Sequence, residues 1–371
     1  MPLLPHSPEE LAEALVKATE QKQRIRIFGG DSKRVMGGPI GESDTEISTR
    51  EMRRVLAYEP TDLTISVEAG MPFRQLEQLL ADKGQMLPLD PPFAQSGTIA
   101  GTLAANLSGP RRRLYGTARD LIIGMKYVTV EGRVVQSGGM VVKNVAGLDT
   151  AKLMVGSWGT LAAIAVVNFK VLPKPPCSQT FLMTFDTAGS LARKRNAILN
   201  SVLQPCAIDV LNPAAAKRLG LSGFVLAVQV AGSAKVIARY NTEFTGAAAL
   251  EDAQEASFWN QIRDFAPQFM VENPTGIVMK IPRTIQSMVE TLSIQEPVLG
   301  RGGNGVCYAC YATGAPAVFP SGAVLDYSPE FNRSGQTLWP SPGPDFKIMQ
   351  NLKGLFDPAN LLNQGRLYGR I

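Results

Sequence analysis

The spacing of apolar and polar residues changes from helical to alternating near the start of the chain. Residues 7–23 carry apolar side chains at helical spacing, with Ser7 as a candidate N-cap, Pro8 in the first turn and Glu10 placed for a capping box. Residues 24–28, "RIRIF", then alternate as a strand does and end in the glycine loop "GGDSKR". The opening pattern therefore predicts a helix, a strand and a loop.

Predicted strands and helices continue to follow one another along the rest of the chain. Strands are predicted at 63–70 and 160–173, a helix at 72–84 and a hairpin at 121–139 around Glu131-Gly132. After "PKPP" (173–176), strands "QTFLMTF" and "FVLAVQV" alternate with helices at 188–203 and 234–244, and a last helix and tail occupy 345–371. This order predicts an α+β fold.

The length of the chain predicts more than one domain. A chain of 371 residues exceeds the roughly 250–300 residues that one core usually supports. We therefore expect domains at 1–175 and 176–330, with "PKPP" (173–176) at the boundary, followed by a C-terminal segment, 331–371.

Net charge and histidine content exclude several classes of function. The net charge of +5, from 37 basic and 32 acidic residues, suits an anionic ligand but lacks the dense clustering of a nucleic-acid binder. The one histidine, His6, leaves the chain without a catalytic triad or a histidine metal site of its own. We found no signal peptide and no apolar run long enough for a membrane span. We therefore expect a cytoplasmic protein with reduced thiols, which can still reach a membrane through another subunit.

Three glycine-rich stretches are the strongest candidates for a binding site. They are "GGDSKR" (29–34), "SGTIAGTLAAN" (96–106) and "KNVAGLDTAKLMVGSWGTL" (143–161). Glycines let consecutive backbone N–H groups converge on an anion. A tight turn is an equal alternative for the first stretch, and a close-packed helix start is the alternative for the second. Three such stretches in one half of the chain favour one extended ligand that contains a diphosphate.

Three other motifs have simpler interpretations. "GRGGNG" (300–305) leads into an alternating strand rather than a helix, so it is a chance match to the dinucleotide fingerprint. Cys307 and Cys310 are too few for a metal site, so we expect core cysteines. The run Arg111 to Arg113 is expected to be a solvated loop, with diphosphate neutralisation or an acidic partner as alternatives.

Four stretches in this order resemble the vanillyl-alcohol-oxidase / p-cresol-methylhydroxylase superfamily of FAD-binding proteins. They are 61–92, 96–128, 138–161 and 355–368. "GQMLPLDPP", "LSGPRR" and "VKNVAG" followed by Asp149 are more specific and resemble the FAD-binding subunits of bacterial glycolate oxidases. The likeness spans nearly the whole chain but is weak over 176–330. It implies a two-subdomain PCMH-type FAD-binding domain, a smaller α+β cap domain and a C-terminal tail that returns to the first domain.

The resemblance also implies which residues hold FAD. Gly29, Gly30, Asp31, Ser32 and Lys33 would cradle the diphosphate; Pro91, Ser96, Gly97, Thr98, Gly101 and Thr102 would line diphosphate and flavin; Gly116 would pack near the flavin, and Ile164 would face the adenine. Gly147, Gly156 and Gly159 would be points of close backbone packing. Asp31 stands where members with covalent FAD often have histidine, so we expect non-covalent FAD.

The same resemblance implies a division of labour between subunits. Related 2-hydroxy-acid dehydrogenases use histidine-bound metal beside the flavin, and this chain lacks those histidines. We therefore expect a glycolate oxidase subunit that works with a sister FAD-binding catalytic subunit and an iron–sulfur subunit. A self-sufficient flavin oxidoreductase for another 2-hydroxy acid or alcohol, and a scaffold that has lost FAD, are the alternatives. Candidates for a catalytic side chain near the flavin are Lys143, Tyr115 and Arg119. The sequence assigns a catalytic role to none of them, and it assigns no metal ligand.

Overall fold

The computed structural model describes residues 1–140, 148–314, 316, 319–329, 333 and 337–371. It divides into two compact units. Unit 1 comprises Met1–Leu107, Thr117–Lys174 and Glu330–Ile371, and unit 2 comprises Ser108–Gly116 and Pro175–Pro329. The segment 108–116 thus belongs with unit 2, although the sequence placed it within the first domain.

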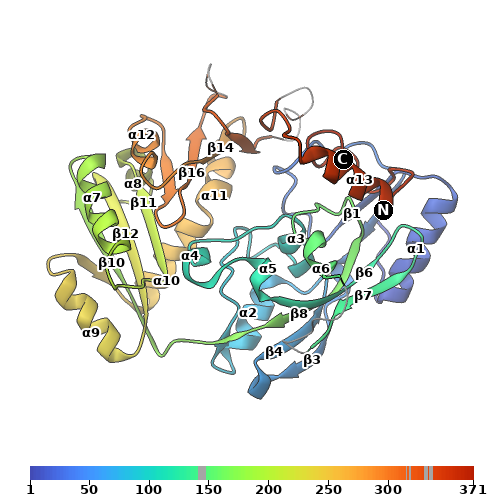
Figure 1. The fold of residues 1–371 in the computed structure, drawn as a ribbon, viewed down its shortest axis with the longest axis horizontal. Coiled ribbons are helices and arrows are strands. Elements are labelled where there is room, and N and C mark those ends of the chain that lie inside the picture. Colours follow the sequence, from blue (N-terminus) through green and yellow to red (C-terminus); the bar gives the residue numbers. More distant parts are fainter. Residues whose placement is uncertain (141–147, 315, 317–318, 330–332, 334–336) are drawn as a thin grey trace. The chain divides into compact units, whose positions relative to one another are not determined.

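An antiparallel sheet forms the centre of unit 1 (Figure 1). Its described strands follow the order β3 (Val55–Glu59), β4 (Thr64–Glu68), β8 (Ala163–Lys170), β6 (Ile122–Val128) and β7 (Val134–Gly138). Strands β6 and β7 are the predicted hairpin, whose register pairs Val128 with Val134. Gly132 allows its tight turn with a φ of 79°.

The sheet of unit 1 buries side chains on both faces. One cluster joins the sheet to α2 (Phe73–Ala81) and α3 (Ile99–Ala104), and it extends to the short helices α5 (Ala118–Leu121) and α6 (Ala151–Met154). A second cluster joins Ala163 and Ala165 of β8 to α1 (Pro8–Glu20). Because β8 is covered on both sides, it is almost entirely apolar, which explains why its sequence shows little alternation.

Helix α1 confirms its predicted start, but only half of the capping box forms. The Ser7 side chain accepts a hydrogen bond from the Glu10 N–H at 3.2 Å, and Pro8 begins the helix. The Glu10 carboxylate accepts from the N–H of His6 at 2.8 Å instead of from that of Ser7. The reciprocal bond is therefore shifted by one residue.

Two small strand pairs complete unit 1. Strand β1 (Ile25–Phe28) pairs in parallel with β2 (Thr45–Ser48), and β5 (Gln85–Met86) pairs with β9 (Leu172–Pro173). The C-terminal segment contributes α13 (Phe346–Phe356) and then bridges from Leu362 to β1. The predicted return of the tail to this part of the chain is confirmed.

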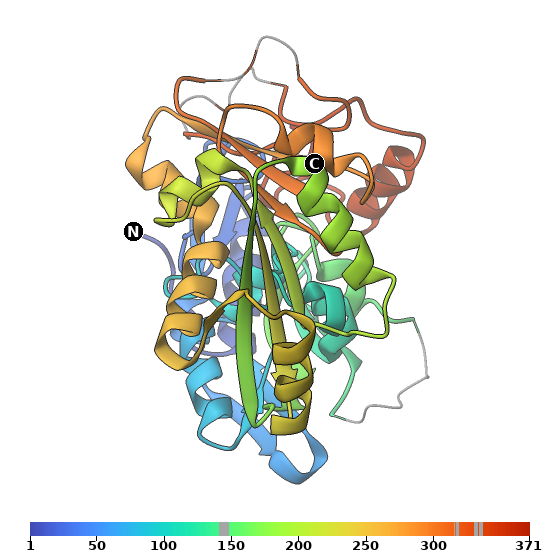
Figure 2. The ribbon, with the colours of Figure 1, turned by 90° about the vertical axis from the view of Figure 1, so that its left-hand side faces the viewer.

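The described part of unit 2 contains a long antiparallel sheet, whose strands lie side by side in Figure 2. Their order is β13 (Ala248–Leu250), β10 (Cys177–Phe185), β12 (Phe224–Gly232), β11 (Ala207–Leu211), β15 (Val298–Arg301), β16 (Val306–Tyr311), β14 (Ile277–Pro282) and β17 (Val324–Tyr327). The helices of this unit are α4 (Arg112–Tyr115), α7 (Ala188–Leu199), α8 (Pro213–Arg218), α9 (Ala234–Glu243), α10 (Asp252–Arg263), α11 (Phe265–Glu272) and α12 (Met288–Leu292). The α+β class is confirmed.

The arginine run at 111–113 is not the solvated loop that we expected. The Arg113 guanidinium donates to the carbonyl of Pro205 at 2.8 Å, and burial lowers its pKa. The Arg111 guanidinium donates to Gln229 at 3.4 Å, while Arg112 is exposed. Two of the three arginines therefore attach α4 to its own unit.

The remaining motifs behave as the sequence indicated. "GRGGNG" begins in the last two residues of β15 and forms the turn into β16, so it joins two strands. Cys307 and Cys310 are buried free thiols, and burial raises the pKa of each to about 12. Among the described residues, no three His, Cys, Asp or Glu side chains are grouped closely enough to hold a metal ion. No helix in the described part has the length and apolar character needed to cross a membrane.

Candidate functional site

A cavity in unit 1 collects residues that lie far apart in the sequence. Its walls come from β1 and the loop after it, residues 40–43, the start of α3, the turn at 158–164 and the C-terminal segment 361–366. Nine of the sequence-predicted site residues line it: Gly29, Gly30, Asp31, Ser32, Lys33, Thr98, Gly101, Gly159 and Ile164. The structure thus brings the described glycine-rich stretches to one place.

The two glycines after β1 let backbone segments approach each other. A Cβ atom on Gly29 would overlap the Thr98 side chain, and one on Gly30 would lie 2.5 Å from the carbonyl oxygen of Ser96. Contacts this short are not tolerated between real atoms, so side chains are excluded here. The exposed backbone of this loop can therefore face the cavity directly.

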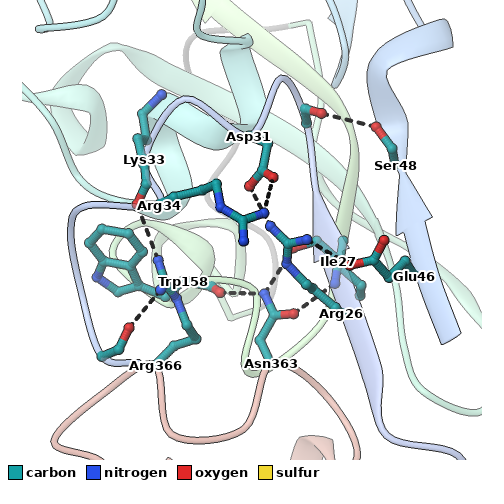
Figure 3. A network of polar contacts seen from close by, with 12 residues as sticks. Arg26, Ile27, Asp31, Lys33, Arg34, Glu46, Ser48, Trp158, Asn363 and Arg366 are labelled. Carbon is teal, nitrogen blue, oxygen red and sulfur yellow. Dashed lines mark hydrogen bonds and ion pairs between the residues drawn. The ribbon is translucent and has the colours of Figure 1, made fainter. Parts of the chain in front are cut away.

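The negative charge of the Asp31 carboxylate is neutralised within the protein. This carboxylate is ion-paired with Arg26 on one side and with Arg34, at 2.8 Å, on the other (Figure 3). Arg26 also forms an ion pair with Glu46 at 2.7 Å. The network fixes the shape of the loop after β1, and only the backbone of Asp31 remains suited to a phosphate.

Lys33 is a buried cation beside this loop. The residue is 9% exposed, and its ammonium group donates to the Ser32 hydroxyl at 3.0 Å. Burial lowers the pKa of Lys33 to about 8. A buried ammonium group is costly without a counter-charge, so its position indicates an anionic ligand.

The other predicted residues that the structure describes are not among those that line the cavity. Ser96 and Gly97 directly precede the lining residue Thr98, Pro91 is buried in the preceding loop and Thr102 is 1% exposed within α3. Gly116 belongs to unit 2, where it ends α4 with a φ of 81°. Gly147 and Lys143 fall outside the described residues.

Only one of the two described glycines at 156 and 159 marks a close approach. A Cβ atom on Gly159 would lie 2.6 Å from the amide nitrogen of Asn363. At Gly156 the nearest atom would be 3.5 Å away, which is ordinary contact, and its φ of 85° is what favours glycine there. The expectation of close packing at Gly156 was wrong.

The sequence missed the contribution of the C-terminal segment to this cavity. The Asn363 side chain accepts from the Ile27 N–H at 2.7 Å and donates to the carbonyls of Ile27 and Trp158 (Figure 3). Arg366 packs over the Trp158 ring and donates to the carbonyl of Gly38. "LLNQGRLY" was part of the resemblance, but nothing local in it reveals a contact with β1, more than three hundred residues away.

Comparison with known proteins supports FAD as the cofactor of this chain. Residues 2–138 match a family described as "FAD binding domain". These residues are therefore similar to a known FAD binding domain. The expected superfamily resemblance and the expected cofactor are both confirmed.

Two relatives and a solved structure extend this result beyond the FAD binding domain. The chain is 28% identical to "Glycolate oxidase subunit GlcE" of Escherichia coli (strain K12) over 98% of both chains. It is 27% identical to "Glycolate oxidase subunit GlcD" of Bacillus subtilis (strain 168), over 57% of this chain and 45% of that protein. The fold matches p-cresol methylhydroxylase with substrate bound, with a TM-score of 0.72, 14% identity and coverage of 99% of this chain and 88% of that one. The PCMH-type fold is therefore confirmed.

The cavity in unit 1 has the features that a dinucleotide needs. Gly29 and Gly30 have no room for a Cβ atom, and their bare backbone lies at the cavity wall, where N–H groups can reach phosphate oxygens. Lys33 supplies a buried positive charge, and Ile164, Ala162 and Leu361 supply apolar wall. This combination of a cation, bare backbone and apolar surface fits FAD.

Proposed function

We propose that the chain is the FAD-binding subunit of a multi-subunit glycolate oxidase, an enzyme that converts glycolate to glyoxylate. The observation that carries this proposal is the likeness to GlcE, which extends over 98% of both chains and so includes unit 2. A shared cofactor domain alone would support only a flavoprotein. The cavity in unit 1 adds a binding site of suitable chemistry.

The residues of this chain would hold FAD without a covalent bond. The backbone of Gly29 to Ser32 and the ammonium group of Lys33 would bind the diphosphate, and Thr98 and Gly101 would close the cavity beside it. Ile164 and Gly159 would form the wall at the adenine side. Pro91, Ser96, Gly97 and Thr102 would line the diphosphate and the flavin, and Gly116 would pack near the flavin. When bound, FAD supplies an acceptor for the hydride that leaves the substrate carbon.

We infer that the substrate hydroxyl is activated by another subunit. The chain contains one histidine, His6, whose backbone N–H bonds to Glu10 at the exposed start of α1. A sister FAD-binding subunit would supply the metal and the base, and an iron–sulfur subunit would receive the electrons. The complex would be cytoplasmic, with contact to the inner face of the membrane only through its other subunits.

The test is a visible absorption spectrum of the purified chain, followed by anaerobic glycolate. We expect a flavin spectrum that glycolate bleaches only after the sister and iron–sulfur subunits are added. Bleaching of the isolated chain would contradict the dependence on partners and favour a self-sufficient oxidoreductase. A colourless protein that takes up no added FAD would overturn the proposal and favour a scaffold.

A further inference from the structure

The ammonium group of Lys33 occupies space that two glycines leave open. A Cβ atom on Gly97 would lie 2.9 Å from this nitrogen, and one on Gly101 would lie 3.8 Å from it. The nitrogen also lies 5.7 Å from the centre of the Phe93 ring. Lys33 therefore reaches inward along the start of α3 and does not extend into solvent.

No carboxylate of the described residues forms an ion pair with Lys33. Asp31, on the same loop, is paired with Arg26 and Arg34. The other charged residues on the segments around it are Asp90, before α3, and Arg366, whose guanidinium donates to the backbone carbonyl of Lys33 at 3.4 Å. Burial alone lowers the pKa of Lys33, to about 8, with no part played by these charges.

We propose that Lys33 is the counter-charge of the FAD diphosphate and that FAD binding above neutral pH takes up a proton at this side chain. The inference rests on the proposed site for FAD, and it adds a charge requirement to that site. The diphosphate brings negative charge to a buried cation whose described surroundings otherwise offer the Ser32 hydroxyl. A charge-assisted bond of this kind favours the protonated amine.

The pH dependence follows from the two protonation states. Near pH 7 the amine of the free chain is already largely charged, so FAD binding changes its protonation little. Above pH 8 the free amine is largely neutral, whereas the bound diphosphate raises its pKa and draws in a proton. The Kd for FAD should thus be constant near pH 7 and rise by up to about tenfold per pH unit above pH 8, until the raised pKa is passed.

The experiment titrates FAD into the full chain after its flavin has been removed. Quenching of flavin fluorescence gives the Kd from about pH 7 to about pH 9.5, and calorimetry in two buffers of different ionisation enthalpy gives the protons taken up at about pH 8.5. The variants are Lys33→Gln, Lys33→Arg and, as the matched control, Lys83→Gln, which removes an exposed lysine of the same unit. Thermal unfolding confirms that each variant is folded.

We expect proton uptake by the wild-type chain and by Lys83→Gln, and none by Lys33→Gln. Lys33→Gln should bind FAD on the order of tenfold to a hundredfold more weakly near pH 7, with a Kd that no longer rises with pH. Lys33→Arg stays charged at every pH measured, so its Kd should also be free of the alkaline rise.

The outcomes separate this inference from the proposed function. If the wild-type chain binds FAD without proton uptake at about pH 8.5, the inference about Lys33 is overturned but the proposed FAD site is not. This result does not depend on whether Lys33→Gln folds. An unchanged Kd in folded Lys33→Gln would do the same. Failure of the wild-type chain to bind FAD at any pH would overturn both.

Discussion

Neighbouring glycines in the loop after β1 differ in what a side chain would meet. At Gly29 the obstacle is the Thr98 side chain, which could rotate only by giving up its hydrogen bond from the Gly101 N–H. At Gly30 it is the backbone carbonyl of Ser96, which can move only if the loop before α3 moves too. The same kind of residue is therefore more restrictive at the second position.

We predict that Gly30→Ala raises the Kd for FAD by about tenfold, because the loop must shift away from the cavity wall. Gly41→Ala is a matched control in the same cavity, since its Cβ would find its nearest atom 3.9 Å away. Fluorescence titration of both variants gives the comparison. Equal affinities would mean that the close contact at Gly30 does not shape the site.

Residue chemistry predicted the glycine loop and missed Asn363. The loop can be recognised because its glycines follow a strand directly, which is a local signal. Asn363 acts by bonding to Ile27 and Trp158, and these contacts depend on how distant segments meet. A single sequence does not show which distant segments come into contact.

Helix α13 is joined to the segment after it by a buried ion pair. The Lys353 ammonium group bonds to the Asp357 carboxylate at 2.6 Å and to the carbonyls of Thr160 and Leu362. The Asp357 carboxylate also accepts from the N–H groups of Leu361 and Leu362. Burial lowers the pKa of Lys353, and the bond to Asp357 opposes that shift.

We predict that Lys353→Met lowers the free energy of unfolding by about 3 kcal/mol, because Asp357 then remains buried without its cation. FAD affinity should fall too, since the ion pair positions the residues that lead to Asn363. Lys347→Met changes an exposed lysine of the same helix and should have little effect. Chemical denaturation and FAD titration give both quantities, and equal stabilities of the two variants would contradict this role.

At the scale of elements, the periodicity of the sequence predicted individual helices and the hairpin but did not predict how distant strands pair. The hairpin β6–β7 and helix α2 follow from spacing and glycine stops, because their contacts are local. The parallel pair β1–β2 was not predicted, since β2 is a four-residue strand that depends on β1 and the tail for its burial. Short strands that are stabilised by distant neighbours leave little pattern in the sequence.

The polypeptide passes between the two units more than once. Residues 108–116 leave unit 1, contribute α4 to unit 2 and return before β6. Within unit 2, Arg113 packs over Gly303, where a Cβ atom would collide with the Arg113 side chain. Two motifs that had separate explanations in the sequence, the arginine run and "GRGGNG", therefore form one contact.

We predict that Arg113→Ala lowers the free energy of unfolding by about 2 kcal/mol, because the carbonyl of Pro205 loses its donor and Gly303 loses its cover. Arg112→Ala, at the exposed neighbouring position, should change it by less than about 0.5 kcal/mol. Denaturant unfolding of the full chain measures both. A larger loss for Arg112→Ala would show that the run acts through its exposed charge.

The cavity in unit 1 draws its walls from both the early and the late parts of the chain, from Arg24 to Arg366. During synthesis on the ribosome, β1 and the glycine loop emerge long before Asn363 exists to hold them. A nascent chain must therefore pass through a period in which this wall is missing. Cofactor capture would then be a late event in biogenesis, and tight retention of flavin would report that translation has passed the C-terminal segment.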